Sequence, residues 1–437
     1  MADIAPMRPL HYDPALMPMV VAPPYDVIDE PMRARLAARH ENNVVHIDLP
    51  QGEGETKYDN ARERFEAWQR SSVLVRDESA AFWRYAQTFV PPGGGEAITR
   101  KGFLSLVRAV PLSERVILPH ERTLKGPKLD RLMLSRATRA TLSPQFMLYS
   151  DPDRTLDADL DSGEPFADFK TEDGIRQQLW RVTEPAAIQR IVEFMRDRTM
   201  LIADGHHRYE TSVAISEEFE AAARAQGQVT SDRSEHRYTF AFLANGDDPS
   251  LVVFPTHRLV HSLQSFDWLG FLRQLEPWFD ATFFNGRIND LHSGLADSGP
   301  LAIGAVAKGA RAALLKLKPN VNLANHPVLG RRPAVLHETS VALLHDMILE
   351  GCLKISPEAQ AQKTNLKYLQ EPKAGLAALE RNEGQVLFLM NGTPLSVVRK
   401  VAEAGEVMPQ KSTFFYPKVI TGLCFHTLRS DHSISAS

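Results

Sequence analysis

The sequence predicts a mixed α/β protein, because segments with strand-like and helix-like patterns alternate along most of the chain. Of its 437 residues, 43% are hydrophobic and 24% are charged, which are ordinary values for a globular protein. The chain is also too long for one small hydrophobic core, so we expect two or three domains or lobes.

The N-terminal region, residues 1–110, is predicted to combine an extended start with helices and a β-hairpin. Consecutive prolines, Pro23 and Pro24, disfavour a helix within residues 1–30. Three glycines at 93–95 lie between two strand-like segments, and no helix follows them, so they indicate a hairpin turn and not a nucleotide-binding loop. The expected elements are a helix at 30–40, a strand at 43–49, a helix at 58–69, and strands at 81–90 and 97–110.

Residues 111–265 form the predicted central core. Helix and strand patterns alternate here around an acidic, turn-rich stretch at 151–175, which we expect to be an exposed connection. The expected elements are helices at 129–140, 185–196 and 209–223, and strands at 146–149, 180–182, 200–203, 238–243 and 251–260.

Residues 266–400 are predicted to form a second α/β lobe, and residues 401–430 a C-terminal segment that returns to the candidate site. Residues 431–437 are expected to be a frayed tail. The elements expected in the second lobe are helices at 268–278 and 337–349 and strands at 301–306 and 386–390.

Charge and cysteine content exclude several classes of protein. The net charge of −4 argues against a broad surface for nucleic acid or anionic membrane. Cys352 and Cys424 are the only cysteines, so a disulfide framework and a four-cysteine zinc site are excluded. The start of the sequence has no signal-peptide pattern, and no apolar run reaches the length of a membrane span. We therefore expect a cytoplasmic protein with neither a membrane nor a nucleic-acid partner.

The strongest candidate for a functional site is the segment Asp204-Gly205-His206-His207-Arg208, which joins an apolar strand to a helix. Backbone N–H groups point outward at a helix start and suit an anion. Arginine binds phosphate in a bidentate manner, histidine donates to a phosphate oxygen or transfers a proton, and an aspartate could bind Mg²⁺. The segment therefore predicts a phosphate-binding turn.

Two alternatives remain for this segment. The first is a buried Asp204–Arg208 ion pair beside solvated histidines, which has no ligand role. The second is a zinc site, which is disfavoured because adjacent histidines do not share a helix face and no His-Glu-x-x-His pattern or cysteine is near. The chain also lacks the phosphate-binding loop of P-loop NTPases and the motifs of protein kinases, so phosphoryl transfer would need a different binding element.

Three shorter patterns offer further candidates. Glu121, which follows His120, could act as a general base toward a hydroxyl, or it could be a solvated loop residue. The triplet Lys411–Thr413 could bind a phosphate or an amino-acid carboxylate, or its hydroxyls could cap backbone groups of a turn. Arg258, within a Pro-Thr-His-Arg segment, is a similar but less specific candidate.

Seven motifs occur in order along nearly the whole chain. They are Ala-Pro-Pro-Tyr-Asp-Val-Ile (22–28), Pro-His-Glu-x-Thr (119–123), Lys-x-Asp-Arg (128–131), Ser-Pro-x-Phe-x-Leu-Tyr (143–149), Ala-Asp-Gly-His-His-Arg-Tyr-Glu-Thr (203–211), Pro-Thr-His-Arg-Leu-Val (255–260) and Met-Pro-x-Lys-Ser-Thr-x-Phe-Tyr-Pro-Lys (408–418). Together they resemble the large prokaryotic domain-of-unknown-function family numbered one thousand and fifteen.

A more distant resemblance rests on three of these motifs. Pro-His-Glu, Asp-Gly-His-His-Arg and Pro-x-Lys-Ser-Thr, in that order, are similar to motifs of the free-serine kinases of the ParB/sulfiredoxin-like superfamily. The resemblance implies a ParB/sulfiredoxin-like nucleotide-binding core with large N-terminal and C-terminal α/β elaborations. It also implies phosphorylation of the hydroxyl of free L-serine to O-phosphoserine, with ATP or ADP as donor and Mg²⁺ as cofactor.

The resemblance also implies roles for individual residues. Glu121, beside His120, would deprotonate the substrate hydroxyl, and Asp204 would assist catalysis or bind Mg²⁺. The nucleotide phosphates would bind Gly205, His206, His207 and Arg208, and the substrate would lie against Lys411, Ser412 and Thr413. One departure concerns Phe414-Phe415, which stand where those kinases have Arg-His. The substrate carboxylate would then need Lys418, Arg258 or Lys411 as its anchor.

Three functional hypotheses follow. The first is an Mg²⁺- and nucleotide-dependent kinase that acts on a small hydroxyl compound, foremost the free amino acid L-serine. The second is a nucleotide-binding regulator of the ParB-like type that does not turn over a small molecule. The third is a metal-dependent hydrolase that uses Asp204, His206 and His207 and contains stoichiometric transition metal.

Overall fold

The computed structural model describes residues 2–92, 94–123, 125–161, 163–284, 286–309 and 311–434. The chain forms two compact units. The first unit consists of Met1–Pro119, Thr123–Leu251 and Pro417–Ser437, and the second of His120–Arg122 and Val252–Tyr416. Each unit has its own main sheet and its own hydrophobic core, so each is described by itself.

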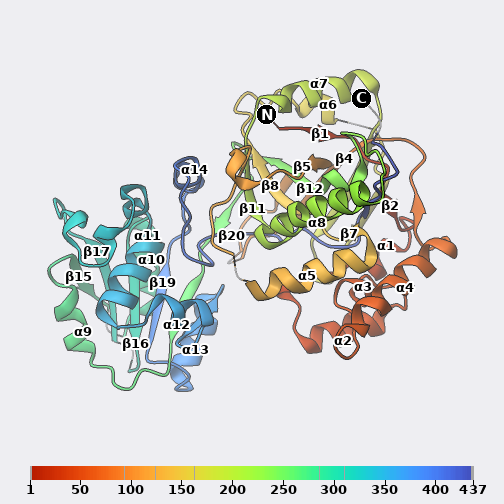
Figure 1. Cartoon of the computed structure of the whole chain (residues 1–437). Coiled ribbons are helices and arrows are strands. Elements are labelled where there is room, and N and C mark those ends of the chain that lie inside the picture. The colour runs from red at the N-terminus through yellow and green to blue at the C-terminus, as the bar shows by residue number, and fades with distance from the viewer. Residues whose placement is uncertain are drawn as a thin grey trace. The chain divides into compact units, whose positions relative to one another are not determined.

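A nine-stranded sheet forms the centre of the first unit (Figure 1). Its strands are β1 (Ile4–Ala5), β4 (Phe82–Phe89), β5 (Ile98–Arg108), β6 (Ile117–Leu118), β8 (Gln145–Tyr149), β9 (Ala167–Lys170), β10 (Arg176–Val182), β11 (Met200–Asp204) and β12 (Tyr238–Asn245). Their order is β6-β11-β8-β12-β5-β4-β10-β9, and β1 pairs with β5 outside this path. The pairs β6–β11 and β8–β12 are parallel, and the other pairs are antiparallel.

Helices pack on both faces of this sheet (Figure 1). α7 (Pro185–Arg196) carries apolar residues at helical spacing, and Ile188, Ile191 and Met195 pack with the strands in one core. α8 (His206–Ala225) lies on the other face, where it contacts β8 and β12. Only Gly205 separates the end of β11 from the start of α8.

The remaining helices of the first unit come mostly from its N-terminal part. They are α1 (Met17–Val20), α2 (Glu30–Arg39), α3 (Val45–Asp48), α4 (Thr56–Arg70), α5 (Lys125–Thr138) and α6 (Asp157–Leu160). α3 contacts α4, α4 contacts α5, and α5 contacts α8, so these helices pack in series. Two short strand pairs complete the unit, namely β2 (Leu10–His11) with β3 (Val75–Arg76) and β7 (Ala140–Thr141) with β21 (His426–Thr427).

A six-stranded antiparallel sheet forms the centre of the second unit. Its strands are β14 (His257–Val260), β15 (Phe279–Phe283), β16 (Ile303–Ala307), β17 (Arg311–Leu317), β18 (Leu366–Leu369) and β19 (Val386–Met390), in the order β15-β17-β16-β19-β14-β18. Leu291, Leu295 and Leu379 from helices pack on this sheet against Leu387 and Leu389. A separate pair, β13 (Val253–Phe254) with β20 (Phe414–Phe415), joins the two ends of the unit.

The helices of the second unit have at most 10 residues each, whereas α8 of the first unit has 20. They are α9 (Trp268–Leu275), α10 (Ile288–Asp297), α11 (Ser340–Ala342), a π-helix at Leu343–Cys352, α12 (Pro357–Gln362), α13 (Pro372–Glu380) and α14 (Leu395–Glu403). Among the described residues of the whole chain, no helix is both long and apolar enough to cross a membrane.

The predicted mixed α/β class is confirmed, as are the hairpin of β4 and β5 and the strand–turn–helix unit of β11 and α8. Gly93, one of the three glycines predicted to form the turn, lies outside the described residues. The strand predicted at 43–49 is wrong, because this segment contains α3. Asn43 Oδ1 accepts the N–H of Val45, and Asn43 Nδ2 donates to the carbonyl of Met19, so the asparagine starts a helical turn.

Several other predicted elements are wrong in detail. The single strand expected at 251–260 is interrupted at Pro255, which has no N–H to donate, and forms β13 and β14. The stretch at 151–175 is not a plain connection, because it contains α6 and β9. The helix expected at 337–349 is divided into a 3₁₀ turn at Ala334–Glu338, α11 and the π-helix.

The two ends of the chain also differ from the expectation. Residues 1–30 contain α1 in addition to extended segments. The tail 431–437 is not frayed throughout, because the N–H of Ile434 donates to the carbonyl of Arg233 at 2.8 Å. Residues 435–437 lie outside the described residues.

Candidate functional site

The predicted phosphate-binding turn lies where β11 ends and α8 begins. Gly205 occupies the N-cap position with a φ of 93°, which is left-handed backbone. A Cβ at this position would lie 3.0 Å from the guanidinium carbon of Arg208, so a side chain at 205 would displace that group. The N-cap residue is a glycine, so it has no side chain that could cap the first turn of α8. The turn therefore combines a backbone that requires glycine with a helix start that suits an anion.

Asp204 forms ion pairs with two cations. Arg208 Nη2 donates to Asp204 Oδ2 at 2.8 Å, and Lys418 Nζ donates to Asp204 Oδ1. The Arg208 side chain is 8% exposed, and those of Asp204 and Lys418 are 20% and 18% exposed. Arg208 also donates to the carbonyl of Pro144, which fixes its position. An Asp204–Arg208 ion pair is thus present, with Arg208 buried, Asp204 partly exposed and Lys418 as a third member.

The chain segment that carries Lys418 is attached to the centre of the sheet. Arg100 of β5 donates through Nη2 to the carbonyl of Pro417 at 2.6 Å, and Gln87 of β4 donates through Nε2 to the carbonyl of Lys418 at 3.1 Å. Arg100 is 1% exposed. Burial lowers the pKa of Arg100 to about 10, while the charges of Tyr85 and Asp204 oppose this shift. Two strands therefore determine where the Lys418 ammonium lies.

Two further motifs of the sequence lie near the turn. Arg131 pairs with Asp48 at 3.0 Å and with Asp130 at 2.7 Å, and its guanidinium carbon lies 4.2 Å from the centre of the Tyr25 ring. Burial raises the pKa of Asp48, and the charges of Arg131 and Arg208 lower it. Arg208 acts in the same way on Tyr25, whose pKa burial raises. The turn, Tyr25 and Arg131 thus belong to one electrostatic network.

The first turns of α8 also hold the segment around Thr123. Thr123 Oγ1 donates to Glu210 Oε1 at 3.0 Å, and Lys128 Nζ donates to Glu210 Oε2 at 2.9 Å. His206 and His207 are the first two residues of α8, and both are half-buried. Because the histidines are at the helix start, their backbone N–H groups belong to those without an intrahelical partner.

A Mg²⁺ ion at this turn would have only a single carboxylate of the turn, Asp204, as a ligand. Within the described residues, no group of three His, Cys, Asp or Glu side chains is arranged to hold a metal ion. Mg²⁺ in nucleotide sites is commonly bound by one or two carboxylates together with phosphate oxygens and water. Asp204 fits the role of such a single carboxylate ligand, with the nucleotide supplying the remaining charge.

The second unit holds the other predicted residues. His120 Nε2 lies 2.8 Å from Thr413 Oγ1, and the N–H of Met408 donates to the carbonyl of His120 at 2.8 Å. The backbone of Glu121 pairs with that of Met408, and its side chain is half-buried. Pairing along the backbone thus places His120 and Glu121 beside the segment that ends in Thr413.

Arg258 is buried in this second set. It is 1% exposed, and its Nη2 donates to the carbonyl of Lys411 at 2.9 Å. Burial lowers its pKa to about 10, and the charges of Tyr368 and Glu121 oppose the shift. Arg258 therefore stabilises the turn at Lys411, where φ is 57°. Its place in the interior favours a positioning role over direct contact with a substrate.

The residues predicted to line the substrate differ in exposure. Ser412 is 4% exposed, and its hydroxyl donates to the carbonyl of Pro409. Lys411 is exposed, and Thr413 is half-buried. Phe414 and Phe415 form β20 and are 8% and 1% exposed, so both belong to the core of this unit.

The structure thus brings the predicted residues together in two sets. The first-unit set contains Asp204, Gly205, His206, His207, Arg208 and Lys418. The second-unit set contains His120, Glu121, Arg258, Lys411, Ser412 and Thr413. The sequence analysis did not single out Arg100, Gln87, Asp48, Arg131 or Tyr25 as part of the first set. The motifs 22–28 and 128–131 carried a signal for Tyr25 and Arg131, whereas nothing in the local sequence indicated Arg100.

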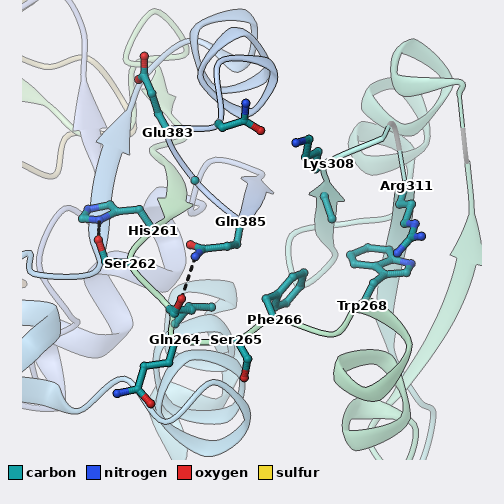
Figure 2. A pocket seen from close by; sticks show the side chains of 14 residues that line it. His261, Ser262, Gln264, Ser265, Phe266, Trp268, Lys308, Arg311, Glu383 and Gln385 are labelled. Carbon is teal, nitrogen blue, oxygen red and sulfur yellow. Dashed lines mark hydrogen bonds between the residues drawn. The ribbon is translucent and has the colours of Figure 1, made fainter.

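A cavity elsewhere in the second unit does not involve these residues (Figure 2). It has a volume of about 560 Å³ and lies where β14 and β16 end and β19 begins. Figure 2 shows Lys308, Arg311 and Phe266 on one side and His261 and Gln385 on the other. The candidate residues are therefore separate from this cavity.

The fold and the first-unit set describe a mixed α/β protein with a basic turn at the start of a helix. Residues 4–340 match the family described as "Protein of unknown function (DUF1015)". The chain belongs to this family, which confirms the resemblance found in its sequence motifs.

Other known proteins are less similar. No protein among the curated ones matches the sequence. Solved structures similar to this chain include a free serine kinase in complex with AMP, with 13% identity and a TM-score of 0.33, which covers 70% of this chain and 88% of that one. A free serine kinase variant in complex with ADP has 10% identity and a TM-score of 0.35, with the same coverage. SbnI with a C-terminal truncation from Staphylococcus aureus has 10% identity and a TM-score of 0.37 and covers 76% of this chain and 91% of that chain.

Proposed function

We propose that this protein is an Mg²⁺- and nucleotide-dependent kinase for a small hydroxyl compound, with free L-serine as the best candidate. The observation that carries the proposal is the turn at the start of α8, where Arg208 and Lys418 pair with the two oxygens of Asp204 beside the first turn of the helix. A nucleotide phosphate is the ligand class that suits two cations and a helix start. The motif resemblance to free-serine kinases supports free L-serine as the phosphate acceptor.

The first-unit set would bind the nucleotide. The N–H groups after Gly205 would donate to phosphate oxygens, and Arg208 and Lys418 would contribute positive charge. An ammonium has three donors, so Lys418 can contact a phosphate while it stays paired with Asp204. Phosphoryl transfer depends mainly on positioning and charge stabilisation, which these side chains would supply.

Mg²⁺ would bind at the same turn. Asp204 would provide one carboxylate oxygen, and the phosphates and water would complete the coordination. When bound, the ion neutralises charge on the phosphates and orients them for transfer. Arg208 and Lys418 would hold the Asp204 carboxylate in place.

The second-unit set would act on the acceptor. Glu121 is proposed as the base that removes the proton of the substrate hydroxyl, and Thr413, held by His120, would contact the same substrate. Arg258 would hold the turn of Lys411 in place. Because Phe414 and Phe415 are buried in β20, they do not supply an anchor for the substrate carboxylate. The exposed Lys411 is the best remaining anchor, since Arg258 is buried and Lys418 is assigned to the nucleotide phosphates.

The proposal is tested with purified full-length protein, Mg²⁺, L-serine and either ATP or ADP. We expect O-phosphoserine by phosphorus NMR, and its absence with both L-serine and a pool of metabolites would contradict the kinase assignment. Glu121→Gln should reduce the rate of turnover and leave nucleotide affinity unchanged in calorimetry. Glu114→Gln, in a 3₁₀ turn of the first unit, is a control that should match the wild type.

Nucleotide binding without turnover of any metabolite would instead support the regulator hypothesis. The hydrolase hypothesis has a separate test, which is metal analysis of the purified protein. The lack of a suitable group of three ligands among the described residues gives that hypothesis no structural support.

A further inference from the structure

A cavity of about 540 Å³ lies among the N-terminal helices of the first unit. This volume falls within the range of about 300–1,000 Å³ that is typical of small-molecule pockets. Its walls come from α2, the connection to α3, α3 itself and α4, and they contain none of the residues of the first-unit set. Its charged and titratable lining residues are Arg33, Glu41, His46, Glu63 and Arg64.

Arg33 is a buried cation without a carboxylate partner. It is 7% exposed, its Nε donates to the carbonyl of Leu49 at 2.8 Å, and it forms no ion pair with another described residue. Burial lowers the pKa of Arg33, and only the charge of Glu30 opposes the shift. A buried charge that lacks a counter-charge is costly. A carboxylate that enters the cavity would therefore be stabilised by a guanidinium already held in place.

A second guanidinium acts on the same space. Arg64 Nη1 donates to the carbonyl of Glu41 at 3.3 Å, and Arg64 forms no ion pair within the described part of the chain. Burial lowers the pKa of the His46 imidazole, and so do the charges of Arg64 and, more weakly, Arg33. Hydrogen bonds of the ring to the backbone of Ala37 and His40 oppose this shift. The positive potential of both arginines thus reaches the His46 ring.

The acidic lining residues determine what else the cavity can accept. Glu41 and Glu63 are exposed, and neither forms an ion pair with a described residue. The formal charges of the lining cancel, with two arginines against two glutamates and a neutral histidine. A polyanion would be repelled by the glutamates, whereas a neutral molecule with separated charges would satisfy both signs.

We propose that this cavity binds a small zwitterion of the amino-acid type, with its carboxylate on Arg33 and Arg64 and its ammonium on Glu41 or Glu63. The amide side chains that line the cavity would contact a polar remainder of the ligand. Such a site is separate from the proposed nucleotide site and does not depend on the kinase assignment.

The test is calorimetry on the full-length protein with each of the common L-amino acids at millimolar concentration. We expect at least one to bind. Its decarboxylated amine and its 2-hydroxy acid should bind more weakly by about tenfold or more, because each loses one charged contact. Inorganic phosphate, as an anion without a positive charge, should bind more weakly than the best amino acid.

Two substitutions assign the binding to this cavity. Arg64→Gln should lower the affinity for the amino acid by about tenfold, which corresponds to about 1.4 kcal/mol. Arg62→Gln is a matched control, because Arg62 lies on the same helix, is exposed, pairs with Asp59 at 3.1 Å and does not line the cavity. Arg64 is preferred to Arg33 because Arg33 also holds the backbone at Leu49. Binding should also raise the pKa of His46 in an NMR titration.

Three results would overturn the proposal. They are the absence of binding by any amino acid, equal affinity in Arg64→Gln and Arg62→Gln, and phosphate binding at least as tight as the best amino acid. Asp204→Asn is expected to lose nucleotide affinity and keep amino-acid affinity at the cavity. A failure of this proposal is thereby distinguished from a failure of the kinase proposal.

Discussion

Asp204 links residues that are far apart in the sequence. Its carboxylate pairs with Arg208, four residues further along, and with Lys418, 214 residues further along. The pair with Arg208 joins the end of β11 to the first turn of α8, which is compatible with a purely structural role. The added cation leaves the three side chains with a net positive charge, which favours an anion at this turn.

Replacement of Asp204 should show how much the three charges depend on one another. Asp204→Asn leaves Arg208 and Lys418 without their carboxylate, so we expect the free energy of unfolding to fall by about 1–3 kcal/mol. Adding Lys418→Met should recover part of this loss, because one unpaired cation is removed. Urea unfolding of the two variants measures both effects.

Asp159→Asn is a suitable control, because its partner Arg190 is 57% exposed. The stability of this variant should stay within about 0.5 kcal/mol of the wild type. If the double variant is no more stable than Asp204→Asn, the interaction of Lys418 with Asp204 does not contribute as described.

Gly205→Ala should damage the turn in two ways. The left-handed φ of 93° costs about 1 kcal/mol for a residue with a side chain, and the new Cβ would lie against the Arg208 guanidinium. We expect a loss of about 2 kcal/mol in urea unfolding, together with weaker ADP and ATP binding. Gly227→Ala isolates the backbone cost, because Gly227 has a φ of 68° and open space around it. If Gly205→Ala and Gly227→Ala lose the same stability, the contact of the new Cβ with the Arg208 guanidinium has no effect.

At the scale of single elements, the start of α8 and the short segment Pro417–Lys418 have different origins. α8 begins where it does because a buried strand ends at a glycine. The position of Pro417 depends on Arg100, a buried residue of β5 whose guanidinium also stacks over Phe146 at 4.6 Å. A strand interior thus determines where a C-terminal lysine is presented.

Two buried histidines predict the acid sensitivity of the second unit. Burial lowers the pKa of His257 in β14 to about 4, with Arg258 and His292 adding to the shift, and that of His345 in the π-helix to about 3, with Arg258 adding to it. Both pKa values lie below the unfolded value of about 6.5. The unfolded state therefore binds more protons as the pH falls below about 6.5, and stability is lost from there down to about pH 3, the lower of the two native pKa values.

The size of this effect can be measured by urea unfolding at several pH values. For His257, which is 1% exposed, the shift corresponds to at most about 3 kcal/mol. His257→Gln should unfold at a lower urea concentration at neutral pH, since Met390 N–H donates to His257 Nδ1, but should lose less stability on acidification. His432→Gln, at an exposed position, serves as the control. A pH dependence unchanged in His257→Gln would contradict the assignment.

At the scale of the whole molecule, the predicted residues divide into two sets, and the kinase proposal gives each set a different ligand. In hydrogen exchange, ADP with Mg²⁺ should protect the amides at 204–208 and 418–419. Addition of L-serine should further protect amides at 120–122 and 410–413. The physical reason is that a bound ligand accepts hydrogen bonds from backbone N–H groups, excludes water from them and stabilises the local structure.

A control for this experiment uses Asp204→Asn, in which the nucleotide-dependent protection should be lost. Protection of the 410–413 segment by the nucleotide alone, or a lack of any response to L-serine in a protein that makes O-phosphoserine, would contradict the division of roles.

The amino-acid sequence determined the local features of this protein. The mixed α/β class, the β4–β5 hairpin and the strand–turn–helix unit at Asp204 follow from periodicity and from the glycine. Local periodicity failed where hydrogen bonds from other segments decided the backbone, as at Asn43, which binds the carbonyl of Met19. Local periodicity also failed at Pro255. The apolar pattern continues through this residue, but proline has no N–H, so the hydrogen-bond ladder of the strand is interrupted.

Only the tertiary structure decided which charges meet. The pairing of Lys418 with Asp204 and the binding of Pro417 by Arg100 depend on sheet order, which is set by contacts across hundreds of residues. The burial of Arg258 and of Phe414-Phe415 likewise comes from packing within the second unit. A sequence shows which residues can carry a charge or donate a proton. Their pairing and exposure arise only when the chain excludes water around them.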